Sequence, residues 1–149
     1  MIVYRGTDLH FARDLRGEGA RLAGGRWNSP GNPMLYTASS RSLALLEILV
    51  HSTVRPLGKA IVTLELPPRL RIQKIDLADL PAGWNDRPHS SVGQKIGDEF
   101  LKAMDSLALQ VPSAIVNEES NILINPLHPS ARMIKIIEIE PLNVDSRLK

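Results

Sequence analysis

The stretch from Met34 to Val50, MLYTASSRSLALLEILV, combines a strand pattern and a helix pattern within one short segment. Met34 to Ala38 predicts a strand, and Ser39 or Ser40 can cap a helix that follows it. The helix carries apolar residues on nearly all sides up to Val50, so we expect it to be buried. This stretch therefore predicts a strand that leads directly into a buried helix.

Outward from this stretch, strands and helices alternate without a regular rhythm. A capping-box pattern at Ser91 and Gln94 begins the clearest amphipathic helix, with its apolar residues at Val92, Ile96, Phe100, Ala103 and Leu107. Further strands are predicted at Ile2 to Tyr4, Lys59 to Leu66, Leu70 to Ile75, Ser113 to Val116, Asn121 to Ile124 and Met133 to Glu140. The Gly-rich and Arg-rich stretch from Arg16 to Asn32 has no clear period and is expected to be a functional loop. This mixture predicts an α+β fold with mixed β-sheets and flanking helices.

Composition limits the classes of protein that fit. A chain of 149 residues supports one domain over residues 1–149, and 43% hydrophobic with 23% charged residues is typical of soluble globular proteins. The formal net charge of +2 is too small to indicate a nucleic-acid-binding surface. We see no signal peptide and no apolar run long enough to span a bilayer, so the cytoplasm is the expected location and no membrane partner is expected.

Metal chemistry is not expected either. The chain has no Cys, which excludes disulfides and thiolate ligands, and its four His residues form no pair at a spacing typical of metal ligands. We therefore predict no metal and no cofactor.

The first unusual cluster is GGRWN, Gly24 to Asn28. Glycines allow the backbone to approach a ligand closely, and the planar guanidinium of Arg26 matches phosphate oxygens. A phosphate-bearing ligand is the functional interpretation. A glycine turn with a surface Arg and a core Trp is the commoner outcome for an isolated cluster of this kind.

Glu47 lies inside the apolar run from Leu43 to Val50, where burying a carboxylate costs free energy unless a partner is present. Arg26 is the natural candidate partner. A carboxylate that projects from apolar surroundings into a cleft can stabilise a cationic transition state or hold a sugar hydroxyl. A partly exposed Glu at the helix edge, or one paired with a structural Arg, explains the sequence equally well.

The third cluster runs from Val111 through Ser113 to Asn121, and then to His128 and Pro129. No Gly-x-Ser-x-Gly pattern surrounds Ser113, so its hydroxyl is expected to orient a ligand and not to act as a nucleophile. The segment Asn125 to Pro129 is expected to be a turn, since Asn-Pro and His-Pro are ordinary turn formers.

Together these clusters resemble the RES-domain family, named for an Arg, a Glu and a Ser spaced along the chain. The resemblance covers nearly the whole chain. It rests on Tyr4-Arg5, GEGA (Gly17 to Ala20), GGRWN, LYTA (Leu35 to Ala38), the helix with Glu47 and His51, VPSAI (Val111 to Ile115), Glu119 to Asn121, and NPLHP (Asn125 to Pro129).

The resemblance implies a function and a site. Family members are toxins of bacterial toxin–antitoxin pairs, their fold is similar to that of ADP-ribosyltransferases, and their substrate is NAD. By position, Arg26, Glu47 and Ser113 are the expected catalytic residues. Tyr36, Arg5, Gly25, Trp27, Asn28 and Asn121 are the expected substrate-binding residues.

The expected reaction is cleavage of the nicotinamide–ribose bond. Glu47 would stabilise the ribosyl cation, Arg26 would anchor the diphosphate, and Tyr36 would pack against a ring. Arg26, Tyr36, Glu47 and Ser113 should then surround one cleft. The acceptor of the ADP-ribosyl group, whether water, phosphate or a protein, stays open.

The expected partner is a cognate antitoxin with a helix-turn-helix DNA-binding part, and a homodimer is compatible with the sequence. The alternatives are a protein ADP-ribosyltransferase, an RNA-cleaving toxin that uses His and Arg, and a silent module that only binds its antitoxin. Weak net charge and scattered His disfavour RNA cleavage, and the joint presence of Arg26, Glu47 and Ser113 disfavours the silent module.

Overall fold

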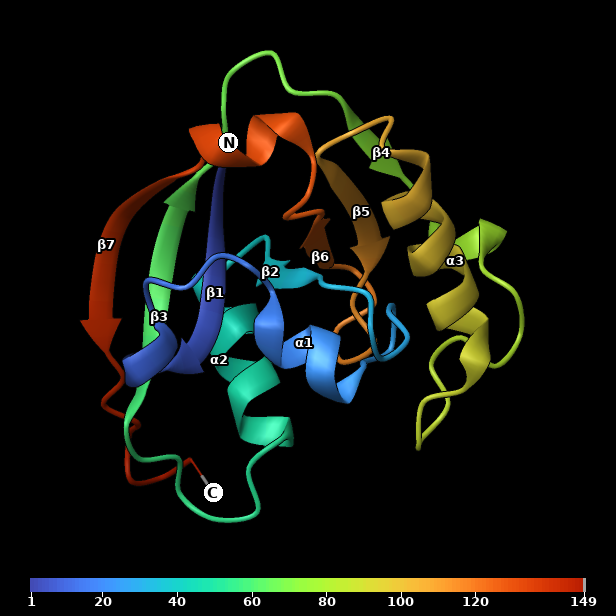
Figure 1. Cartoon of the computed structure of the whole chain (residues 1–149). Coiled ribbons are helices and arrows are strands. Elements are labelled where there is room, and N and C mark those ends of the chain that lie inside the picture. Colours follow the sequence, from blue (N-terminus) through green and yellow to red (C-terminus); the bar gives the residue numbers. More distant parts are fainter. Residues whose placement is uncertain (149) are drawn as a thin grey trace.

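The computed structural model describes residues 1–148 and consists of one seven-stranded sheet with three α-helices (Figure 1). The strands are β1 (Ile2–Asp8), β2 (Leu35–Ala38), β3 (Lys59–Glu65), β4 (Ile72–Lys74), β5 (Ala108–Pro112), β6 (Ser120–Ile124) and β7 (Lys135–Pro141). The helices are α1 (Glu18–Ala23), α2 (Arg41–Val50) and α3 (Ser91–Ala103). The predicted α+β fold is confirmed. Residue 149, the last of the predicted domain, lies outside the described residues.

The strand order is β4-β5-β6-β2-β1-β3-β7, and every neighbouring pair is antiparallel except β4 with β5. β1 pairs with β3 over its whole length, but it meets β2 at one position only, Tyr4 opposite Ala38. The sheet is therefore held loosely at its middle, between a half containing β7, β3 and β1 and a half containing β2, β6, β5 and β4 (Figure 1).

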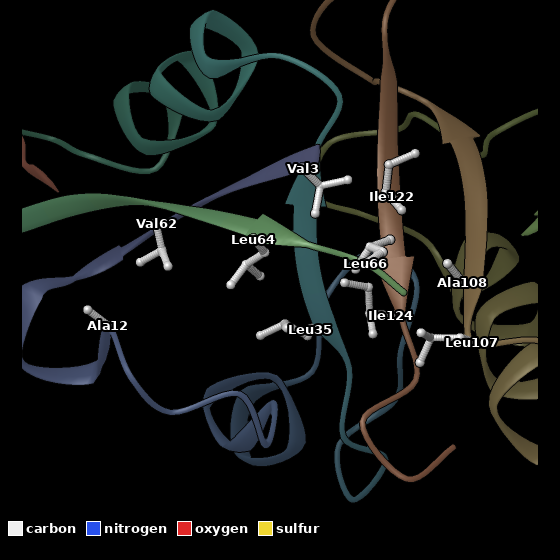
Figure 2. Close-up of a cluster of buried hydrophobic side chains, with 10 residues drawn as sticks. All are labelled: Val3, Ala12, Leu35, Val62, Leu64, Leu66, Leu107, Ala108, Ile122 and Ile124. Carbon is white, nitrogen blue, oxygen red and sulfur yellow. The ribbon is translucent and has the colours of Figure 1, made fainter. Parts of the chain in front are cut away.

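The main core lies on one face of the sheet and joins both halves (Figure 2). It is built by alternate residues of the central strands, because successive side chains of a strand point to opposite faces. Its fully buried members include Val3, Val62, Leu64, Ile122 and Ile124. Burial of this apolar surface couples the two halves, although β1 and β2 share so few hydrogen bonds.

The opposite face carries α2 and α3, each with its own core cluster. Over β1, α2 buries Leu43, Ala44 and Ile48, and a Cβ at Gly6 would lie 2.6 Å from Cγ1 of Ile48. A glycine at position 6 thus permits the helix to approach this closely. The cluster under α3 contains Trp27, Met34, Trp84, Phe100, Leu109, Val111 and Leu123.

Several predicted elements are confirmed, with corrections at particular residues. The strand and capped helix at 34–50 are confirmed, and the cap is Ser40, whose Oγ accepts the N–H of Leu43. The helix is not buried all round: only three of its residues are fully buried, and Val50 is 47% exposed. The predicted loop at 16–32 contains the short helix α1, within which Glu18 and Arg21 form an ion pair.

The second half of the chain needs more correction. The capping box at Ser91 is wrong, because Ser90 caps α3 and the Gln94 side chain bonds elsewhere. Leu107 lies beyond the end of α3. The predicted strand at 113–116 is a turn, and the strand before it is β5, which ends at Pro112. Within residues 1–148, no helix is both long and apolar enough to cross a bilayer.

Candidate functional site

The GGRWN loop is folded back on itself and fastened to β2. The N–H of Gly25 donates to the carbonyl of Asn28, 2.9 Å away. The Tyr36 hydroxyl accepts the N–H of Trp27 at 3.0 Å and donates to Oδ1 of Asn28 at 2.7 Å. A Cβ at position 25 would lie 2.6 Å from the Tyr36 hydroxyl oxygen, so this position requires glycine.

Helix α3 packs against the backbone of the same loop. A Cβ at Gly93 would lie 2.5 Å from the carbonyl oxygen of Arg26, and one at Gly97 would lie 1.6 Å from that of Trp27. The side chain of Gln94 donates to the carbonyl of Gly25 at 3.1 Å. Two glycines four residues apart thus form a groove in α3, and the loop that carries Arg26 lies in it.

The Arg26 side chain is oriented by carbonyl groups of the segment before α3. Its Nη1 donates to the carbonyl oxygens of Trp84 at 2.8 Å and Asp86 at 3.2 Å. Within the described residues, Nε and Nη2 have no protein hydrogen-bond partner. The guanidinium edge formed by these two nitrogens is therefore available for bidentate binding of an oxyanion. Burial lowers the pKa of Arg26, the positive charge of Arg87 lowers it further, and the carboxylate of Glu47 opposes both. Arg26 stays protonated at neutral pH, as arginine does in proteins.

Glu47 projects from α2 toward β6, and its side chain is 30% exposed. Oε1 accepts a hydrogen bond of 2.9 Å from Nδ2 of Asn121, whose position on β6 is opposite Ala38 of β2 and Val111 of β5. Oε2 lies 4.0 Å from Nε2 of His51, one turn further along the helix and largely exposed. Among residues 1–148, Oδ1 of Asn121 is buried and has no hydrogen-bond partner, so the bond from Nδ2 to Glu47 alone sets the orientation of the amide.

The structure therefore brings four predicted residues into one region, the Arg–Glu site, which we define by Arg26, Tyr36, Glu47 and Asn121. Tyr36 and Glu47 both act electrostatically on Arg26, and Asn121 is bonded directly to Glu47. Burial raises the pKa of the Tyr36 hydroxyl, so this group remains neutral and serves as a hydrogen-bonding group. A cation and an anion thus lie near each other, together with a neutral hydroxyl.

Other predicted residues are placed differently. Ser113 is fully buried, and its Oγ accepts the N–H groups of Ile115 at 3.0 Å and Val116 at 3.2 Å, so it stabilises the turn after β5. The Trp27 and Asn28 side chains are also buried, in the core and in the loop respectively. The side chains of Trp27 and Asn28 stabilise the loop, and a direct contact of either side chain with substrate stays a prediction.

Arg5 lies apart from the Arg–Glu site. Its neighbour Gly6 faces α2, so the side chain of Arg5 leaves the opposite face of β1 by strand alternation. There Nη1 donates to the carbonyl of Phe11 at 3.2 Å, and burial lowers the pKa of the guanidinium while Asp14 opposes the shift. The structure does not bring Arg5 to Glu47.

Two hollows of the surface lie away from this site. One, of about 290 Å³, is lined by residues of α2, β3 and the end of β7, including Arg41 and Glu140. The other, of about 220 Å³, lies between the Pro67–Arg71 turn and His128. Neither includes a residue of the Arg–Glu site, and we base the site on its charges and hydrogen bonds.

Comparison with known proteins identifies the family of this chain. The family model described as the RES domain matches residues 2–145. The chain is 40% identical to the Prs ADP-ribosylating toxin of Sphingobium sp. (strain YBL2), over 92% of this chain and 88% of that protein. It is 37% identical to Toxin Res of Photorhabdus laumondii, over 99% of this chain and 97% of that protein.

The fold also has a solved relative. The chain resembles a chain in the crystal structure of the M. tuberculosis MbcT–MbcA toxin–antitoxin complex, with a TM-score of 0.75 and 22% identity. The match covers 95% of this chain and 84% of that one. At this identity the likeness concerns the fold, a mixed sheet with flanking helices.

Proposed function

Because this chain belongs to the RES-domain family, we propose that it is the toxin of a toxin–antitoxin pair and that it cleaves the nicotinamide–ribose bond of NAD. The proposal rests on the site's electrostatics: a carboxylate, Glu47, fixed by Asn121, and a guanidinium, Arg26, with a free edge for an oxyanion. NAD offers a group to each, because its ribosyl group becomes cationic as nicotinamide leaves and its diphosphate is anionic.

The bond that breaks joins C1′ of the ribose to the ring nitrogen of nicotinamide. Its electron pair goes to the pyridinium nitrogen, so nicotinamide leaves as a neutral molecule and needs no general acid. The ribosyl group becomes an oxocarbenium-like cation, which the negative charge of Glu47 stabilises. An acceptor then attacks C1′ and loses its proton. With water, the products are ADP-ribose, nicotinamide and one proton.

Arg26 binds NAD in the ground state, and Glu47 stabilises the transition state. The Nε and Nη2 groups of Arg26 bind one phosphate of the diphosphate in two-point fashion, because Nη1 is already engaged by two carbonyls. Holding the diphosphate places the ribose at a fixed distance from Glu47, which reduces the entropy that must be lost on reaction.

The test is to incubate antitoxin-free protein with NAD and follow nicotinamide release by chromatography. We expect release without added metal. Parallel incubations with phosphate and with total RNA separate phosphorolysis and RNA cleavage from hydrolysis. If NAD stays constant under all conditions while RNA is cut, the proposal is wrong.

Transfer of ADP-ribose to a protein is the second candidate, and the name of the Sphingobium relative favours it. Both candidates share the cleavage step and differ in the acceptor. Mass spectrometry of lysate proteins after incubation with NAD distinguishes them: a protein with one added ADP-ribosyl group supports transfer, whereas free ADP-ribose alone supports hydrolysis.

An antitoxin partner fits both candidates, since the solved relative is a toxin–antitoxin complex. We expect the antitoxin to cover the Arg–Glu site and to suppress nicotinamide release. A purified complex that still consumes NAD at the rate of the free protein would contradict this expectation.

A further inference from the structure

The segment from Trp84 to Arg87 lies directly beside Arg26 and carries a second arginine. The carbonyl of Asp86 accepts from Nη1 of Arg26 at 3.2 Å, and the backbone nitrogen of Arg87 is bonded to the carbon of that same carbonyl. The Cβ of Arg87 is therefore three covalent bonds from the carbonyl carbon of the group that accepts from the Arg26 guanidinium. Arg87 itself is exposed.

The two cations influence each other. After burial, the charge of Arg87 is the largest influence on the pKa of Arg26, and it lowers that pKa more than any single opposing group, Glu47, Tyr36 or Asp86, raises it. Within residues 1–148, no carboxylate lies within salt-bridge distance of either guanidinium. Two nearby cations without a bridging carboxylate repel each other, and an anion bound between them removes that repulsion.

The ligand of the proposed function has the matching charge. The diphosphate of NAD carries one negative charge on each of two adjacent phosphate groups. Arg26 has one free guanidinium edge, which is enough for one phosphate, so the second phosphate needs another donor. Arg87 offers five N–H donors on a long exposed side chain.

We propose that Arg87 binds the diphosphate of NAD together with Arg26, so that the segment Trp84 to Arg87 forms the phosphate-binding wall of the site. This inference rests on the proposed function. It also explains why Arg26 is tied to two carbonyls of this segment: the same contacts that orient Arg26 hold the second cation next to it.

The test measures binding by calorimetry in a Glu47→Gln parent, which retains the phosphate-binding groups and consumes NAD slowly. Arg87→Gln is compared with Arg71→Gln. Arg71 is an exposed arginine that precedes β4 and lies near the start of β5, whereas Val111 lies near the end of that strand. Both substitutions remove one positive charge. The probes are NAD and nicotinamide riboside, which lacks phosphate. Melting temperatures without ligand show whether each variant is folded.

We expect Arg87→Gln to weaken NAD binding about tenfold, the effect of losing one charge-assisted hydrogen bond, and Arg71→Gln to leave it within about twofold. Nicotinamide riboside should bind both variants like the parent. The tenfold difference should shrink as salt rises from about 50 mM to about 500 mM, and Arg87→Lys should recover part of the affinity.

Equal NAD affinity of the Arg87→Gln and Arg71→Gln proteins would overturn the role of Arg87 and leave the proposed function intact. An equal loss for NAD and nicotinamide riboside would also overturn it, because the effect would then not concern the diphosphate. Absence of NAD binding by the parent and of nicotinamide release by the wild type would overturn the proposed function and this inference together.

Discussion

The two charged groups of the Arg–Glu site are held by very different amounts of structure. The loop of Arg26 is fastened by the Tyr36 hydroxyl, by the glycine groove of α3 and by the Gln94 side chain. Within the part of the chain that the structure describes, the carboxylate of Glu47 accepts one hydrogen bond, from Asn121, and the exposed His51 lies 4.0 Å away.

This difference indicates which substitutions report on chemistry. A change in the Arg26 loop or in α3 alters the fold first, because the backbone atoms there are in contact. A change in Glu47 alters the charge and little else. Substitutions in the Arg26 loop or in α3 should therefore change stability most, and substitutions of Glu47 should change the reaction rate most.

Gly97→Ala should have the largest effect. The added Cβ would lie 1.6 Å from the Trp27 carbonyl oxygen, so the loop and α3 must separate. We expect a loss of about 4 kcal/mol in the free energy of unfolding, measured with urea. Gly19→Ala in α1 is the control. Apart from its own turn of helix and its chain neighbours, no described atom lies within 4 Å of the added Cβ, so this substitution should be neutral or slightly stabilising. Equal stability of the two variants would show that α3 does not clamp the loop.

Glu47→Gln should affect the rate instead. It keeps the size of the side chain and removes the charge that stabilises the ribosyl cation, so kcat should fall about 100-fold, equivalent to roughly 3 kcal/mol. The KM for NAD and the free energy of unfolding should change little. Glu99→Gln on the exposed face of α3 is the control. A folded Glu47→Gln protein with near wild-type kcat would leave Glu47 as a structural residue.

The sequence predicted the fold class and all four residues of the Arg–Glu site, partly from local patterns and partly from the family resemblance. Helical spacing and a serine cap identify α2, and a carboxylate within the apolar run identifies Glu47. Arg26 was marked by its glycines, and Tyr36 by its place in the family pattern. The alternation of apolar residues identified most of the strands.

What the sequence did not predict depends on contacts between distant segments. Ser113 looked like the first residue of a strand, but the buried turn that it caps forms only where β5 meets β6. The clamp of α3 was missed, although Gly93 and Gly97, four residues apart within a helix, are a signal of close packing. Arg87 lies in a stretch without periodicity, and only its proximity to Arg26 distinguishes it.

Asn121→Ala tests the hydrogen bond that holds the Glu47 carboxylate, which is held less firmly than the Arg26 loop. Without the amide, the Glu47 carboxylate loses its one fixed orientation, and kcat should fall about fivefold, equivalent to about 1 kcal/mol, with little change in KM. Stability should hold or rise, because the buried Oδ1 without a partner is removed as well. Asn117→Ala in the exposed turn is the control. A stability loss larger than the rate loss would assign Asn121 to the fold.

Asp98→Asn should have the smallest effect, and that effect should depend on pH. Asp98 of α3 accepts the Ser29 N–H at 3.0 Å and the Ser29 hydroxyl at 2.5 Å, which adds a polar contact to the clamp on the loop. Burial raises the pKa of this carboxyl, but the hydrogen bonds of Ser29 together with the influence of Asn32 outweigh burial and leave the pKa below its ordinary value.

A carboxyl whose pKa is lower in the folded than in the unfolded chain stabilises the fold above the unfolded pKa of about 3.9, and that contribution disappears as pH falls through the folded pKa. At pH 7 we expect the Asn variant to be less stable than wild type by less than about 1 kcal/mol, since Asn can still accept one of the two hydrogen bonds from Ser29. The difference should diminish below about pH 4, as wild-type Asp98 becomes protonated. Thermal unfolding across this range measures it, with Glu99→Gln on the next, exposed residue as the control. A difference that stays constant down to acid pH would mean that the shape of the side chain, and not its charge, fastens α3 to the Arg26 loop.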